Sequence, residues 1–96
     1  MSDWRPPAAT IDAMKHYLEL NFLGADIVTW TDADTSSQFF NLRAEAGPLF
    51  CLAVPRAVFD GFTADEIVAL METTEIAEQM RAESPRRVVL EVEERK

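Results

Sequence analysis

The stretch Leu49-Phe50-Cys51-Leu52-Ala53-Val54-Pro55 decides the fold of this 96-residue chain. Every residue before Pro55 in this run is apolar, which is typical of a strand that is covered on both faces of its sheet. Proline cannot donate a hydrogen bond to a neighbouring strand, so Pro55 closes the run. We therefore predict that residues 49–54 form a central strand.

Three further segments have the pattern of strands. Residues 25–31 are rich in β-branched and aromatic side chains, residues 37–44 alternate between polar and apolar ones, and residues 88–93 alternate in the same way. The stretches 32–36 and 45–48 between the earlier strands are rich in turn-forming residues. Strands that are joined by such turns are typical of an antiparallel meander.

A first helix is predicted before the meander. Apolar residues recur at helical spacing from Ile11 to Leu23, and Thr10 is placed to act as the N-cap. Gly24 stands where a left-handed residue would end the helix. The preceding prolines, Pro6 and Pro7, favour an extended lead-in.

A second helical segment is predicted to begin at Ala64. Thr63 and Glu66 have the spacing of a capping box, in which each side chain accepts a hydrogen bond from the other residue's backbone N–H. The residues leave open whether one helix continues to Ala82 or two short helices share this segment. Thr73 and Thr74 lower the helix propensity in its middle.

The predicted fold class is α+β, a two-layer sandwich in the order α-β-β-β-α(α)-β. A mostly antiparallel four-stranded sheet would carry the helices on one face. We expect residues 1–9 to be an extended arm, 10–93 a single α+β domain and 94–96 a polar tail. The sheet face toward the helices is predicted to bury these side chains: Phe40, Leu42, Phe50, Leu52, Val54, Val88, Leu90 and Val92.

The opposite sheet face is unusually apolar for a surface that should meet water. Strand alternation places five candidate interface residues there: Trp30, Phe39, Leu49, Cys51 and Val89. Such a patch favours self-association, and we expect a homodimer. Two alternatives are that the arm with Trp4 covers this face, or that the strand register differs by one residue.

Composition sets several functions aside. The chain has one histidine, one cysteine and three glycines, so it lacks the convergent groups that catalysis, metal binding and phosphate cradles need. We predict no enzyme activity and no cofactor. The net charge of −8 predicts no direct nucleic-acid binding, because affinity for phosphates comes chiefly from clustered lysine and arginine. No apolar stretch approaches a membrane span and no secretory signal is seen, which predicts a cytoplasmic protein.

Two apparent chemical motifs have structural interpretations that we favour. Cys51 and His16 are the only thiol and imidazole, but Cys51 lies within the apolar run, where burial would make it inert. The stretch 32–36 resembles the start of a calcium loop, yet Ser37 and Arg43 occupy the positions that need glycine and glutamate. We interpret it as a hairpin turn.

The remaining signal is an acidic face on the second helical segment, formed by Glu72, Glu75 and Glu78. It suits either a solvated helix surface or a basic partner. The leading functional hypothesis is a small acidic interaction or regulatory module that forms a homodimer. The alternatives are an acidic inhibitor that mimics nucleic-acid charge and blocks a basic partner, and a small ligand-binding protein or enzyme that uses the open sheet face.

Overall fold

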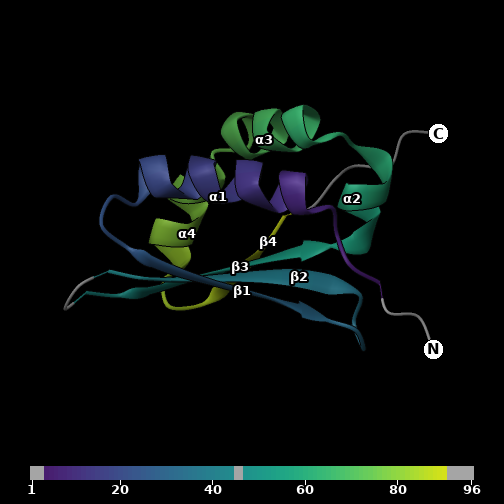
Figure 1. The fold of residues 1–96 in the computed structure, drawn as a ribbon. Helices are drawn as coiled ribbons and strands as arrows, with labels where there is room; N and C mark the ends of the chain where they lie inside the picture. Colours follow the sequence, from purple (N-terminus) through teal and green to yellow (C-terminus); the bar gives the residue numbers. More distant parts are fainter. Residues whose placement is uncertain (1–3, 45–46, 91–96) are drawn as a thin grey trace.

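The computed structural model describes residues 4–44 and 47–90 and has the predicted α+β fold (Figure 1). The element order is α-β-β-β-α-α-α-β. The elements are α1 (Ala8–Asn21), β1 (Asp26–Asp32), β2 (Ser37–Arg43), β3 (Leu49–Pro55), α2 (Arg56–Gly61), α3 (Ala64–Thr73), α4 (Ile76–Glu83) and β4 (Arg87–Val89). None of the helices within the described residues combines the length and apolarity needed to cross a membrane.

The four strands form one sheet in the order β1-β2-β3-β4. The first three strands pair antiparallel, which confirms the meander. β4 pairs parallel with β3, with Leu52 opposite Val88. A parallel neighbour requires a crossover connection, and α2, α3 and α4 provide it. The sheet is therefore mixed but mostly antiparallel.

The helices lie on one face of the sheet and bury its core there (Figure 1). The predicted core positions are confirmed at Phe40, Leu42, Phe50, Leu52, Val54, Val88 and Leu90, each at most 8% exposed. Val92 lies outside the described residues. Met14 and Leu18 of α1 and Ile67 and Met71 of α3 are fully buried against this face. The hydrophobic effect thus fixes which side of the sheet the helices cover.

The start of α1 differs from the prediction. Thr10 is not the N-cap but lies inside the helix, where it is buried. Pro7 is the N-cap residue, and its carbonyl accepts hydrogen bonds from the backbone N–H groups of Thr10 and Ile11, both at 3.1 Å. The reason is that a proline beside the first turn removes only an N–H that the helix would leave unpaired. The helix ends at Asn21, and Gly24 adopts a φ of +80° in the turn that follows.

The second helical segment begins at Ala64, as predicted, and divides into two helices. Both bonds of the capping box are present: Glu66 N donates to Thr63 Oγ1 at 3.3 Å, and Thr63 N donates to Glu66 Oε1 at 2.8 Å. Glu75 has a left-handed backbone with φ of +52°, which ends α3 and begins α4. The short helix α2 was not predicted from the sequence.

Candidate functional site

The sheet face that points away from the helices is the candidate interaction surface, and we call it the outer face. The strand register defines two central rows of side chains on it. One row contains Val28, Asn41, Cys51 and Arg87, and the next contains Trp30, Phe39, Ala53 and Val89. The alternation predicted from the sequence therefore places the candidate residues on one face, because β-strand side chains point to opposite faces in turn.

Three side chains form a stack in the middle of the outer face. The rings of Trp30 and Phe39 are stacked, with centroids 5.3 Å apart and an interplanar angle of 14°. The guanidinium of Arg87 lies 4.8 Å from the Phe39 ring centroid, within the range of a cation–π contact. Trp30 approaches from β1 and Arg87 from β4, which lie on opposite sides of β2 in the sheet. Phe39 is consequently only 8% exposed.

Three apolar side chains in and beside this stack are exposed to solvent. Val28 is 60% exposed, Trp30 43% and Val89 45%. Leu49 and Cys51 are half-buried, so Cys51 is less shielded than its place in the apolar run suggested. Val28 was not among the candidate interface residues. Val28 could have been predicted, because it lies two residues before Trp30 on the same strand and such residues share a face.

The structure places Trp4 away from the outer face. Its indole packs against Phe59 of α2, with ring centroids 5.6 Å apart, and the guanidinium of Arg56 lies 5.8 Å from the indole centroid. Trp4 also joins the core cluster between helices and sheet. Trp4 therefore lies on the helix side, and the alternative in which Trp4 covers the outer face does not match these contacts.

Charged side chains surround the apolar residues of the outer face. The outer-face carboxylates of β1 are Asp26 and Asp32, at the two ends of the strand. Arg87 lies on β4, the opposite edge of the sheet, and Arg43 of β2 lies opposite Asp26 in the register. The exposed Arg86, which precedes β4, is paired with Glu83 at 3.9 Å. The outer face thus carries carboxylates on β1 and guanidinium groups on β2 and β4, around the apolar residues.

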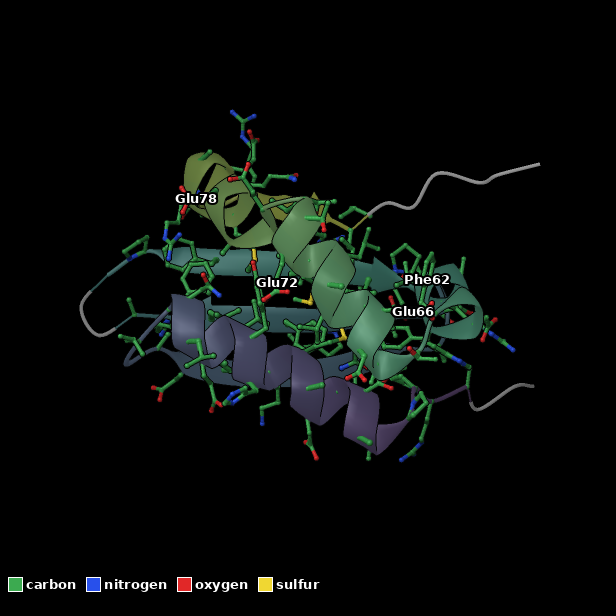
Figure 2. The ribbon with its side chains drawn as sticks, turned by 90° about the horizontal axis from the view of Figure 1, so that it is seen from above. Phe62, Glu66, Glu72 and Glu78 are labelled. Atoms are coloured by element: carbon green, nitrogen blue, oxygen red, sulfur yellow. The ribbon has the colours of Figure 1, made fainter. Side chains whose placement is uncertain are left out.

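The acidic residues predicted on the second helical segment are exposed around the junction of α3 and α4. Figure 2 shows Glu72 and Glu78 on neighbouring helices. Glu75 is also exposed, but Glu78 accepts a hydrogen bond from Arg81 at 2.5 Å, which neutralises part of this face. Arg81 also lies 4.7 Å above the ring of Phe22, so its position is fixed by packing as well as by charge.

Tyr17 of α1 lies beneath this acidic junction. Its hydroxyl donates a hydrogen bond to the carbonyl of Met71 at 3.3 Å, which joins α1 to α3. Burial raises the pKa of the Tyr17 phenol, and the carboxylates of Glu72 and Glu78 raise it further, while Arg81 acts in the opposite direction. Tyr17 therefore contributes to helix packing in its neutral form.

The structure does not bring Cys51 and His16 together. His16 is exposed on α1, which covers the inner sheet face, whereas Cys51 lies on the outer face. Within residues 4–44 and 47–90, no three histidine, cysteine or acidic side chains gather in a way that could hold a metal ion. The stretch 32–36 forms the predicted hairpin turn. There, Asp32 accepts hydrogen bonds from the Asp34 backbone at 3.0 Å and the Thr35 hydroxyl at 3.1 Å.

Comparison with models of known families, with curated proteins and with solved structures finds no match to this chain. The outer face and the charges around it are thus the observations from which a function can be argued.

Proposed function

We propose that this protein is a small interaction module that associates with a second copy of itself through the outer face. The observation that carries the proposal is the exposure of Val28, Trp30 and Val89 on one side of a sheet whose other side holds the core. Apolar side chains that lie together on a surface lose contact with water when a second surface covers them. This contribution favours association.

The distribution of charge favours a second copy as the occupant. A two-fold axis that runs parallel to the strands, between two outer faces, places β1 of one copy over β4 of the other. The carboxylates of β1, Asp26 and Asp32, then lie on the side of the interface that carries Arg87 of the other copy, twice in each dimer. The apolar residues between the edges face one another in the same arrangement. Charges at the rim would fix the register, and the apolar centre would supply the affinity.

The alternative of an acidic inhibitor draws on Glu72, Glu75 and Glu78. The ion pair between Arg81 and Glu78 reduces the negative charge that this surface could offer to a basic protein. Self-association therefore has the stronger support, and it requires no cofactor.

The test compares two substitutions of exposed apolar residues, Val28→Glu and Leu20→Glu. Val28 lies on the outer face and is 60% exposed, whereas Leu20 lies on α1 and is 62% exposed. Both variants add the same charge at similar exposure. We expect sedimentation velocity at high micromolar concentration to show about twice the 10.8 kDa chain mass for the unmodified protein and for Leu20→Glu, but a monomer for Val28→Glu.

These positions make a sharper test than Phe39→Glu. Phe39 is nearly buried in its stack with Trp30 and Arg87, so a charge there would disturb the fold as well as the interface. Unfolding midpoints of the variants serve as the control for folding. A monomeric unmodified protein, or equal association of both glutamate variants, would contradict the proposal.

A further inference from the structure

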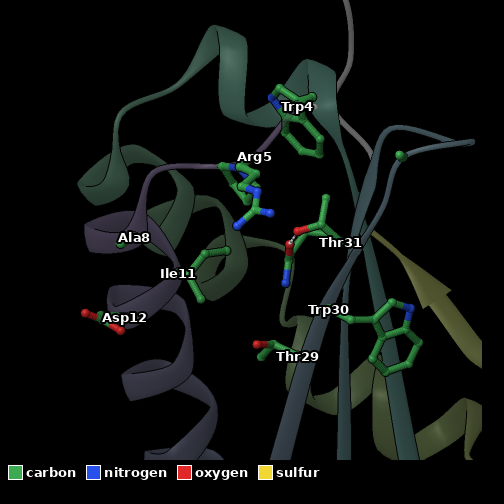
Figure 3. A pocket seen from close by; sticks show the side chains of 11 residues that line it. Trp4, Arg5, Ala8, Ile11, Asp12, Thr29, Trp30 and Thr31 are labelled. Carbon is green, nitrogen blue, oxygen red and sulfur yellow. Dashed lines mark hydrogen bonds between the residues drawn. The ribbon is translucent and has the colours of Figure 1, made fainter. Parts of the chain in front are cut away.

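A second candidate site lies on the other side of β1. An open cavity of about 590 Å³ is lined by residues 4–6, the first turn of α1, the inward side of β1 and Gln38 of β2 (Figure 3). Trp30 lines it from β1, but its indole points to the opposite side of the strand in Figure 3. A volume of this size lies within the range of small-molecule sites in proteins. The cavity is thus separate from the outer face.

The cavity contains a buried amide with a spare hydrogen-bond donor. Gln38 is 3% exposed, and its oxygen accepts a hydrogen bond from the Thr31 hydroxyl at 2.5 Å. The amide nitrogen carries two N–H groups, but among the described residues it has one acceptor, the Phe39 carbonyl, at 3.5 Å. One N–H is therefore left over. This N–H is free to donate to water or to an acceptor atom of a ligand in the open cavity.

Two other polar groups point toward the cavity: the guanidinium of the exposed Arg5, which only donates, and the hydroxyl of Thr29, which donates or accepts. Figure 3 shows the guanidinium of Arg5 between α1 and β1, with the hydroxyl of Thr29 further along the same space. Arg5 makes no ion pair with another residue of the described part of the chain. Asp12 of α1 also lines the cavity, and its carboxylate points outward in the same view. The polar groups inside therefore suit an anion that accepts hydrogen bonds.

The rest of the lining is largely apolar. Trp4, Ile11 and Ala8 contribute side chains to it, and Pro6 and Ala33 complete it. We propose that this cavity binds a small organic carboxylate with an apolar body, whose carboxylate meets Arg5 and Gln38. The net charge of −8 opposes the approach of an anion at long range, so the affinity comes from contacts inside the cavity.

The experiment uses phenylacetate as the probe, phenylacetamide as its neutral analogue and acetate as the anion without an apolar body. Backbone and side-chain amide NMR signals of the full chain are followed during each titration. We expect saturable shifts with phenylacetate that centre on the arm, β1 and the Gln38 amide, and much weaker binding of the other two compounds.

The matched variants are Arg5→Gln and Arg43→Gln. Arg5 lines the cavity, whereas Arg43 is an exposed arginine on the outward side of β2. Loss of a charged hydrogen bond should weaken phenylacetate binding by about tenfold or more in Arg5→Gln. Arg43→Gln should bind like the unmodified chain. Absence of saturable binding, equal affinities of the two variants, shifts centred on the outer face, or equal binding of phenylacetamide or acetate would each overturn the proposal.

Discussion

At the scale of single residues, Thr63 has the most sharply defined role. Its hydroxyl accepts from the N–H of Glu66, one of the donors that α3 cannot satisfy internally. We predict that Thr63→Ala lowers the free energy of unfolding by about 1 kcal/mol, whereas Thr63→Ser, which keeps the hydroxyl, changes it little. Urea denaturation of the unmodified protein and of the two variants measures these differences in the free energy of unfolding. Equal midpoints for Thr63→Ala and the unmodified chain would show that the cap contributes no stability.

The residues of the candidate site show what a sequence can reveal and where it stops. Strand alternation was enough to assign Trp30, Phe39 and Val89 to one face, because the side-chain period of a strand is two. It could not show that Arg87 reaches the Phe39 ring from another strand, since such a contact depends on strand order and side-chain length. Nor could it show the cavity, whose lining comes from the arm, α1 and two strands.

At the scale of the elements, the strands and the start of α3 followed from pattern and capping chemistry. The short helix α2 did not, because its six residues are too few to show a helical period and its N-cap, Pro55, makes no side-chain cap. The break between α3 and α4 was left open by the sequence. It depends on a left-handed backbone at Glu75, a conformation that glycine or asparagine would normally signal.

The left-handed backbone of Glu75 predicts that glycine has opposite effects on the free energy of unfolding at two glutamates. Glu75→Gly removes the steric cost of a φ of +52° and should raise the free energy of unfolding by about 0.5 to 1 kcal/mol. Glu72→Gly, on the helical backbone of α3, should lower it by about 1 kcal/mol. Both variants remove one negative charge from an exposed position, so charge cancels in the comparison. Thermal or urea unfolding measures both changes. If both variants changed the free energy of unfolding in the same direction, the left-handed break between α3 and α4 at Glu75 would be contradicted.

At the scale of the whole molecule, net charge and surface pattern act in opposite directions. Two copies that each carry −8 repel one another at long range, while the outer faces attract through apolar contact and through the opposite charges of β1 and β4. The molecule measures 40 × 30 × 23 Å. At about 0.01 M salt the screening length is about 30 Å, so the whole charge of each copy acts on the other. At about 0.15 M it is about 8 Å, and only groups near the interface still interact.

Self-association should therefore become tighter as salt rises through this range. The repulsion between two acidic molecules is screened, whereas the apolar contact between the outer faces is retained. A complex with a basic protein has the opposite dependence, because screening weakens the attraction that holds it. Sedimentation equilibrium at fixed protein concentration and increasing NaCl measures whether self-association strengthens or weakens with salt. The Val28→Glu variant should stay monomeric at every salt concentration. A dimer that dissociates as salt rises would mean that Asp26, Arg87 and the other edge charges hold the copies together, and that the exposed side chains of Val28, Trp30 and Val89 do not.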